Sequence, residues 1–261
     1  SWWAVQAGLK GAVKSLAFSP ATKTVGHFQR HLDSVLKLDS SAACKYRIEV
    51  PCYKKYDVCR STEPLICYTP HEAFADEIVE NPQQLDELQQ GVLAGQWPDD
   101  YCNHPVRLRT DPATPVLPIA IYFDGVPYTN RNSFTGFFVH SLLSGKRHLV
   151  AILRHSSMCR CGCRGWDTVW PVMQALLWSL MALASGTWPE HKHDGTPWVP
   201  EDGNRFVKAG QPLGVTGCVL QIKGDWSEWA HTFGFPTWTD SRYPCLLCHS
   251  DRTTMYEYSQ L

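Results

Sequence analysis

Two aspartates stand at similar places in the sequence, each directly after an apolar run of strand length. Asp124 follows Leu117–Phe123, and Asp225 follows Gly217–Gly224. An ionised carboxylate is costly to bury alone, so each is expected at the mouth of a strand with a partner or a cation. If the strands are neighbouring and parallel, both carboxylates emerge at one sheet edge, as in two-metal phosphoryl-transfer sites. The alternative is that each Asp ends its strand and opens a turn or caps a helix.

Five cysteines in the second half of the chain form a second candidate site. Cys245 and Cys248 have two residues between them, a spacing that lets two thiolates clasp one zinc ion from a tight turn. Cys159, Cys161 and Cys163 crowd three thiols around a glycine, and neighbouring arginines favour thiolates. We therefore predict a Zn²⁺ site built partly on these residues. The alternative is that all five are reduced thiols in a turn-rich region.

Four cysteines nearer the amino terminus have a different pattern. Cys44, Cys52, Cys59 and Cys67 have seven, six and seven residues between them, which exceeds the spacing of structural zinc sites. They alternate with tyrosines and β-branched residues, a pattern that indicates a small β-rich unit. Because no secretion signal opens the sequence, we expect buried free thiols here rather than a metal cluster or a disulfide framework.

Composition and charge bound the protein class. The chain has 261 residues, 44% of them hydrophobic, which is enough for one large domain or two modest ones. The net charge of -1 gives no global attraction to nucleic acid or membrane. Locally, Ser61–Val106 has no Lys or Arg, and Gly125–Trp166 has no acid. The basic stretch beside Asp124 can track a phosphate backbone, or its charges can be balanced by the acidic segment.

One uncharged stretch has the length of a membrane span. Residues 168–188 carry no charge, but they include Pro171 and Gln174, and the large apolar residues recur at helical spacing. This pattern favours a buried core helix over residues 168–185, and no membrane partner is expected. Asp167 or Thr168 would cap its start, and Gly186 would end it.

The remaining elements fall into two regions. The first region, residues 1–110, is expected to be mixed α+β, with an amphipathic helix over 25–38. A capping box, Thr69–Glu72, predicts an acidic helix through about Val79, followed by further helix to Gln90. The Pro-containing stretch 110–115 is interpreted as a linker.

The second region, residues 111–261, has a more informative order of elements. Three strands with short polar connections are predicted to form antiparallel hairpins, and a crossover helix and a fourth strand follow. A crossover can place the fourth strand parallel to the first, giving an α/β mixed sheet. This is the order that opens the ribonuclease H-like fold, and it brings Asp124 and Asp225 together. The predicted strands are 116–123, 134–143, 147–154 and 218–223, and a further helix begins near Trp226.

A series of short motifs over about residues 115–250 resembles a known family. The order of these motifs is similar to that in the catalytic core of CACTA-class DNA transposases and of the related KDZ transposases of fungi and protists. The match covers less than 60% of the chain, and each motif is short. The motifs are Phe123-Asp124-Gly125, Trp166-Asp167, Gly224-Asp225-Trp226, Gly234-Phe235-Pro236 and Pro244–Cys248.

The resemblance implies DNA strand cleavage and transfer by an acidic triad that binds Mg²⁺ or Mn²⁺. It assigns Asp124 and Asp225 to that triad, DNA as partner and the nucleus as location, and it is compatible with an oligomer. The family also carries a Cys-x-x-Cys after its second Asp, which later residues complete.

The third acid of that triad, usually a glutamate on a later helix, has no clear counterpart in this sequence. Glu228 is too close to Asp225 on the same helix, and Glu257 lies in a polar tail. We therefore expect a truncated or domesticated relative that is active only within a longer chain, or not at all. The competing hypothesis is a non-enzymatic, zinc-stabilised scaffold or nucleic-acid-binding domain.

Overall fold

The computed structural model describes most of the chain after residue 44. By its contacts the chain divides into two units, Ser1–Lys45 and Tyr46–Leu261, and residues 46–110 belong to the same unit as the sheet. The helix expected over 25–38, Cys44 and the Cys245–Cys248 motif lie outside the described residues. The described ranges are 45–53, 59–129 and 132–225, with short pieces between residues 229 and 254.

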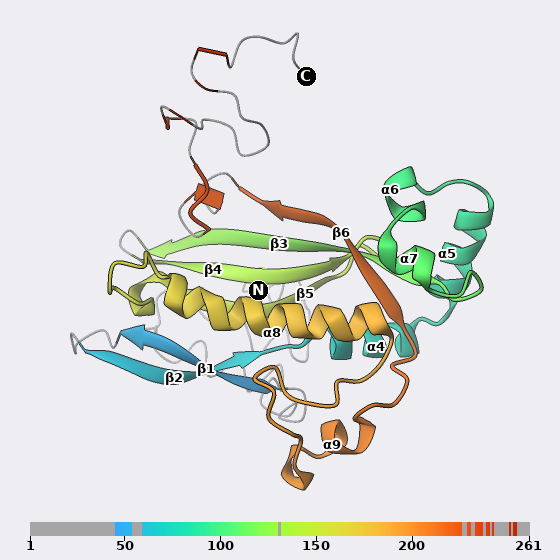
Figure 1. Ribbon diagram of the computed structural model, residues 1–261, viewed down its shortest axis with the longest axis horizontal. Coiled ribbons are helices and arrows are strands. Elements are labelled where there is room, and N and C mark those ends of the chain that lie inside the picture. Colours follow the sequence, from blue (N-terminus) through green and yellow to red (C-terminus); the bar gives the residue numbers. More distant parts are fainter. Residues whose placement is uncertain are drawn as a thin grey trace, which may run out of the picture. The chain divides into compact units, whose positions relative to one another are not determined.

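A mixed four-stranded sheet forms the centre of the second unit (Figure 1). Its strand order is β5-β4-β3-β6, in which β3, β4 and β5 pair antiparallel and β6 pairs parallel to β3. The predicted α/β mixed sheet is thus confirmed, including the parallel fourth strand. The strands are β3 (Val116–Thr129), β4 (Asn132–Ser141), β5 (Arg147–Arg154) and β6 (Thr216–Gly224).

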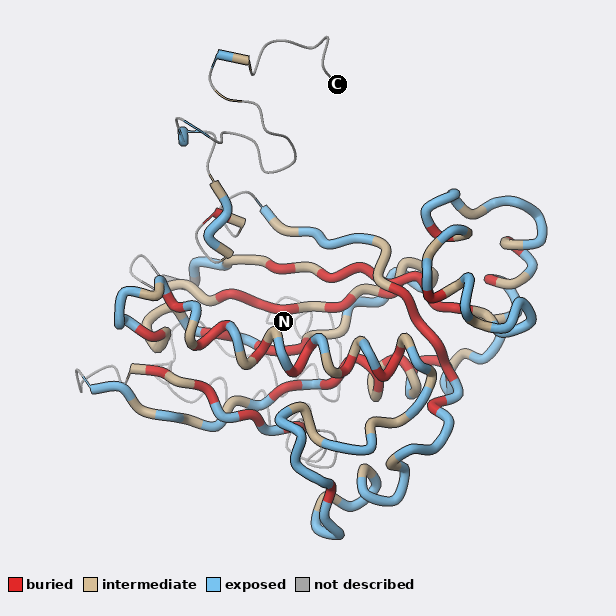
Figure 2. The backbone as a smooth tube through the Cα atoms, in the orientation of Figure 1, coloured by how far each residue is buried: buried red, intermediate tan, exposed pale blue. Residues whose placement is uncertain are grey.

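Helix α8 (Trp166–Ser185) lies along one face of this sheet and connects β5 to β6 (Figure 1). Buried and exposed positions alternate along it at helical spacing (Figure 2), and Val172, Leu176 and Leu183 are almost fully buried. By length and composition alone α8 could cross a membrane, but its apolar stripe packs here on β6 and on the hairpin described next.

The ends of α8 fit the sequence prediction unequally. Gly186 adopts the left-handed conformation and ends the helix, as predicted. The predicted start at Asp167 or Thr168 is wrong, because Gly165, also left-handed, is the N-cap. Asp167 consequently lies inside the first helical turn.

A separate hairpin, β1 (Tyr46–Tyr53) and β2 (Arg60–Cys67), packs on α8, so α8 contacts both β-structures. This confirms the small β-rich unit predicted around the amino-terminal cysteines. Cys52 and Cys67 are buried free thiols, as expected, and burial raises the pKa of Cys67 to about 12. Cys59 is exposed instead, because it lies just before β2 begins.

Four helices lie between β2 and β3. Thr69 is the N-cap of the first, but its hydroxyl donates to the Glu72 carboxylate at 2.6 Å and makes no bond to a backbone N–H, so the predicted capping box does not form. The phenol of Tyr101 donates to the carbonyl of Val116 at 2.6 Å, which fixes the start of β3. The helices are α4 (Pro70–Glu80), α5 (Gln83–Leu93), α6 (Asp99–Cys102) and α7 (Pro105–Arg109).

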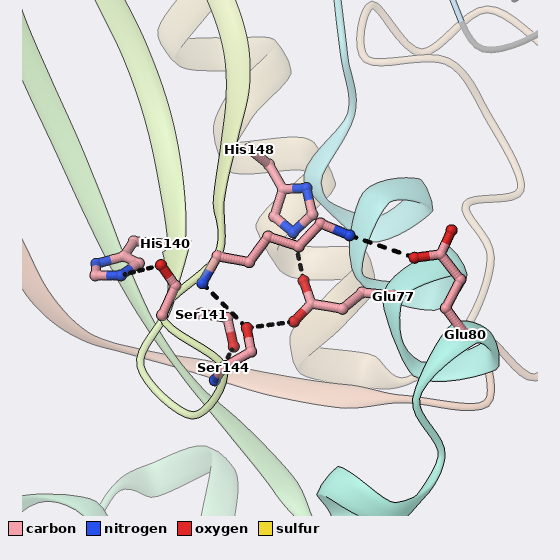
Figure 3. A network of polar contacts seen from close by, with 8 residues as sticks. Glu77, Glu80, His140, Ser141, Ser144 and His148 are labelled. Carbon is pink, nitrogen blue, oxygen red and sulfur yellow. Dashed lines mark hydrogen bonds and ion pairs between the residues drawn. The ribbon is translucent and has the colours of Figure 1, made fainter. Parts of the chain in front are cut away.

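Helix α4 is tied to the β4–β5 hairpin through a buried carboxylate (Figure 3). Glu77 accepts a hydrogen bond from Ser144 and hydrogen-bonds with His148, and Glu80 pairs with Lys146 at the surface. Burial alone would raise the pKa of Glu77, but the hydrogen bonds from His148 and Ser144 outweigh it and lower that pKa. Here the acidic segment balances part of the basic one.

The connection from α8 to β6 is irregular and returns to α4. Arg205 forms a paired contact with the Glu72 carboxylate, with N–O distances of 2.6 and 2.8 Å. This planar, two-point ion pair fixes the α8–β6 connection, which we call the insertion, against α4. The insertion contains η4 (Pro200–Asp202) and α9 (Asn204–Lys208), while η3 (His155–Ser157) follows β5.

Candidate functional site

Asp124 lies inside β3, which corrects the prediction that its strand ends there. Residues 125–129 remain in β3 because they pair with the start of β4. What ends at this point is the parallel pairing with β6, whose last register pair is Phe123 with Gly224. Asp225 follows β6 directly, as predicted.

Asp124 and Asp225 therefore each directly follow one residue of the last register pair between the two parallel strands, Phe123 with Gly224. Side chains alternate across a strand, so Asp124 lies on the face opposite the buried Phe123 and on the same face as Tyr122. The predicted parallel pairing of the two strands is confirmed, whereas the predicted approach of the two side chains to one another stays a prediction. Whether the pair binds an ion stays a prediction.

The phenol of Tyr122 lies within electrostatic reach of both carboxylates. Partial burial, the negative charge of Asp124 with a hydrogen bond to it, and the charge of Asp225 all raise the pKa of Tyr122. The positive charge of Arg147 lowers the pKa of Tyr122, and the Arg147 guanidinium lies 5.7 Å from the centre of the Tyr122 ring. Tyr122 was not among the predicted site residues, although its place two residues before Asp124 in a strand puts the two side chains on one face.

Small and aromatic residues shape the surroundings of Asp124. Its register partner on β4 is Gly136, and a Cβ added there would lie 2.6 Å from the ring of Phe138. Phe138 therefore folds over the glycine and contacts Tyr122, with ring centres 6.0 Å apart. Beneath the strand, Phe123 packs on Phe137 at 5.4 Å. This packing holds the carboxylate on a rigid strand.

A third acidic ligand for the Asp124–Asp225 pair is not found in the part of the chain that the structure describes. Within those residues, only one group of three or more ligand side chains lies close enough to hold a metal ion, and it lies elsewhere. Glu228 and Glu257, considered above from the sequence, fall outside the described residues. Two carboxylates alone offer Mg²⁺ or Mn²⁺ an incomplete set of oxygen ligands.

That other group consists of Cys159, Cys161, Cys163 and Asp167, which we call the cysteine cluster. The three sulfurs and a carboxylate oxygen all lie within 4.8 Å of one another, so the cluster can hold a metal ion such as zinc. Asp167 accepts hydrogen bonds from the thiols of Cys161 at 3.4 Å and Cys159 at 3.6 Å.

The sequence predicted the three cysteines of this cluster but not its carboxylate. Asp167 was interpreted as a helix cap. The signal that could have found it is its spacing, because it lies four residues after Cys163, in the first turn of the helix that this loop enters.

The thiols of the cysteine cluster differ in acidity. Burial raises the pKa of Cys159 to about 12. Burial alone would also raise the pKa of Cys163. Hydrogen bonds outweigh burial and lower this pKa; they come from the backbone N–H groups of Asp167 and Gly165 and from the neighbouring thiols.

The backbone of the loop is tightly turned. Gly162, Arg164 and Gly165 have positive φ angles of 104°, 53° and 87°, and Arg164 is the one non-glycine residue in the described ranges with a positive φ. Such a conformation costs about 1 kcal/mol or more for a residue with a Cβ and persists where surrounding contacts impose it. The Thr168 hydroxyl accepts from the N–H of Cys159 and donates to the carbonyl of Pro51, tying the loop to β1.

Aromatic contacts connect the two candidate sites. Phe233 packs on Phe123, the residue before Asp124, at 4.8 Å, and on Trp166, the residue before Asp167, at 6.4 Å. In Figure 1 the loop that enters α8 lies at the same end of the sheet as the β3–β4 hairpin. The carboxylate pair and the cysteine cluster thus belong to one end of the molecule.

Comparison with protein-family models, curated proteins and solved structures finds no match for this chain. Cys245 and Cys248 lie outside the described residues, so their contribution to a zinc site stays a prediction. A functional conclusion therefore depends on the topology of the sheet and on the side chains at its end.

Proposed function

We propose that this chain contains a ribonuclease H-like, transposase-type core in which Asp124 and Asp225 bind Mg²⁺ or Mn²⁺ and act on a DNA phosphodiester. The observation that carries the proposal is the pairing of β3 with β6, which puts the two aspartates at the next position on neighbouring parallel strands. The order of three antiparallel strands, a helix and a parallel fourth strand supports the same conclusion, since that fold opens with it.

The chain's own residues provide the binding and positioning parts of this chemistry. Asp124 is held on a rigid strand beside the phenol of Tyr122, and Asp225 stands at the exposed end of β6. Asp124 and Asp225 would hold a divalent cation, which would supply charge stabilisation at the phosphate oxygens and activation of a water or a 3′ hydroxyl. Because a third acid is not in place among the described residues, we expect weak cation binding by the pair.

The second part of the proposal is that the metal of the cysteine cluster is Zn²⁺. Three thiolates and one carboxylate make up the four ligands of tetrahedral zinc, and thiolates favour zinc over Mg²⁺ or Ca²⁺. The cluster also favours the second candidate function, a zinc-stabilised nucleic-acid-binding scaffold without catalysis. The two functions differ in whether the Asp124–Asp225 pair binds a cation.

Binding of Mn²⁺ to the purified chain tests the first proposal. We expect weak binding by the wild type and a loss of about tenfold or more in Asp124→Asn and in Asp225→Asn, since each removes a charged oxygen ligand. Asp86→Asn, which removes an exposed carboxylate from α5, is the matched control and should leave binding unchanged. Equal Mn²⁺ affinity in all four proteins would overturn the assignment and favour the scaffold.

A further inference from the structure

Arginines alternate with cysteines in the loop that enters α8. The sequence reads Cys159-Arg160-Cys161-Gly162-Cys163-Arg164, and the three sulfurs converge on Asp167. Because the cysteines are committed to one centre, the intervening side chains turn outward. Arg160 and Arg164 are both exposed.

These two arginines line an open cavity of about 450 Å³ on the side of the loop. His155 and Met158 contribute to its wall. Both ring nitrogens of His155 are already occupied, by the hydroxyls of Ser133 at 2.6 Å and Thr135 at 2.7 Å. The guanidinium groups are therefore the polar groups of the cavity that remain available to a ligand.

The charge around this cavity is positive. No carboxylate of the described ranges forms an ion pair with Arg160 or Arg164. The nearest acid in the sequence, Asp167, faces the thiols and pairs with Arg60 at 3.1 Å. The 42 positions of Gly125–Trp166 contain no acid at all.

Zinc bound in the cysteine cluster would not make the charge around the cavity negative. Zinc with three thiolates and a carboxylate carries a formal charge of about −2. Arg60 already offsets part of it at Asp167, and the two charges of Arg160 and Arg164 outweigh the remainder. An anion approaching the cavity from solvent meets guanidinium groups first.

We propose that residues 159–164 bind the phosphate backbone of a nucleic acid strand through Arg160 and Arg164, and that the metal in the cysteine cluster holds these arginines in place. The choice of nucleic acid as the ligand rests on the proposed function. The loop lies at the same end of the sheet as Asp124, connected to it through Phe233, so a strand bound here extends toward the carboxylate pair. Phosphate contacts of this kind position a strand and carry no sequence preference.

The metal is needed because the loop geometry is strained. Arg164 is held at a φ of 53°, between two left-handed glycines. Without metal, the cluster is held by sulfur hydrogen bonds of 3.4 to 3.9 Å, which are weak. Metal–sulfur bonds would replace these contacts and would keep both guanidinium groups on the cavity side of the loop.

Fluorescence anisotropy with labelled DNA of about 20 nucleotides, in buffer without added Mg²⁺ or Mn²⁺, tests the proposal. We expect Arg160→Gln/Arg164→Gln to weaken binding about tenfold or more at ~0.1 M salt, and to make the negative slope of log K against log salt shallower by about two. Its zinc content should not change. Arg47→Gln/Arg109→Gln removes two exposed arginines elsewhere and is the matched control.

Cys161→Ser tests the role of the metal. We expect it to lose zinc and to bind DNA as weakly as the double arginine variant, while far-ultraviolet circular dichroism reports an intact fold. Wild-type affinity in the double arginine variant would overturn the proposal. Wild-type affinity in zinc-free Cys161→Ser would overturn the role of the metal. Complete displacement of DNA by inorganic phosphate at ~10 mM would indicate a free-anion site instead.

The Asp124→Asn/Asp225→Asn variant separates this inference from the proposed function. It should keep its zinc, and without added Mg²⁺ or Mn²⁺ its DNA binding should still depend on Arg160 and Arg164, because the proposed contribution of the loop does not require a cation at the carboxylate pair. If DNA binding depends on Arg160 and Arg164 while Mn²⁺ binding ignores the aspartates, the carboxylate proposal fails and the backbone-binding loop stands. If Mn²⁺ binding depends on the aspartates while DNA binding does not depend on Arg160 and Arg164, the carboxylate proposal stands and the backbone-binding loop fails.

Discussion

Asp124 and Asp225 each follow one member of the register pair Phe123–Gly224, so residues 101 positions apart in the sequence start side by side at the end of the β3–β6 pairing. The negative charges of both aspartates raise the pKa of the Tyr122 phenol. This relationship depends on strand pairing alone, because the aspartates share no sequence neighbourhood. A substitution that disrupts the pairing of β3 with β6 should therefore also separate the two carboxylates.

Cleavage assays give the first prediction. This chain alone should show little or no Mg²⁺- or Mn²⁺-dependent cleavage of supercoiled or linear DNA, because two carboxylates form an incomplete two-metal site. The measurement is plasmid nicking over time, with and without cation. Robust cleavage that Asp124→Ala abolishes would contradict this expectation and would mean that a further acid of this chain completes the site.

Metal analysis of the purified chain gives the second prediction. We expect about one zinc ion per chain, lost in Cys161→Ser/Cys163→Ser and held less tightly in Asp167→Asn, since thiolates contribute more to the site than the carboxylate. Cys59→Ser, which removes an exposed thiol outside the cluster, should retain the ion. Zinc that persists in the double cysteine variant would place the ion elsewhere.

The alternative location for zinc has its own test. The variant Cys245→Ser/Cys248→Ser removes the Cys-x-x-Cys motif that the sequence analysis singled out. If its zinc content equals that of the wild type, the cysteine cluster suffices. If all zinc is lost, the ion is held by the motif, and the cluster of three thiols would need another explanation.

Acid sensitivity through Glu77 is the third prediction. Its pKa is lowered in the folded chain from an ordinary value of 4.5, because hydrogen bonds from His148 and Ser144 outweigh burial. A lowered carboxyl pKa stabilises the fold above the unfolded value and loses that contribution as the pH falls through the folded value. Urea unfolding should therefore show stability lost below about pH 4.5, and less of this loss in Glu77→Gln.

The control for Glu77 is Glu80→Gln, which removes the exposed carboxylate one helical turn later. It should change stability by less than about 0.5 kcal/mol, whereas Glu77→Gln should cost about 1–3 kcal/mol at neutral pH, since it disturbs buried polar partners. Equal effects of the two substitutions would show that the buried network contributes nothing special.

His71 gives the fourth prediction. Its ring and backbone N–H both contact the Ser179 hydroxyl, at 2.7 and 3.0 Å, and burial lowers its pKa from 6.5 to about 4. Because the folded chain resists protonation there, stability is full above pH 6.5 and falls as the pH drops toward 4, by about 3 kcal/mol in total. His71→Gln should flatten this part of the profile. A wild-type stability that stays constant between pH 6.5 and 4 would contradict it.

The sequence predicted the local elements better than their contacts. Strand β5 matches the expected range 147–154 because its apolar run is bounded by polar turns. The extension of β3 past Asp124 was missed, because pairing with β4 decides it and the apolar run stops earlier. The cap of α8 was missed because Gly165 acts there through its left-handed backbone and offers no capping side chain.

In the candidate site, too, the residues could be predicted from the sequence better than the contacts between them. Residue types and spacing were enough to select Asp124, Asp225 and the three clustered cysteines. Asp167 was missed as a ligand because its approach to the sulfurs depends on how the loop turns into the helix. The burial of Glu77 against His148 could not be foreseen either, since 71 positions separate the two residues.

The pairing of β3 with β6 also has a consequence for the order in which the molecule is made. The hairpins of β3, β4 and β5 join near neighbours in the sequence and can form while the chain is being synthesised, whereas β6 appears only after α8 and the insertion have emerged. Closing so long a loop is slow, because its entropy is lost before the new contacts form. The ends of β3 and β6 are therefore expected to come together late in folding, and a ribosome-bound nascent chain that has not yet exposed β6 would lack the proposed cation site.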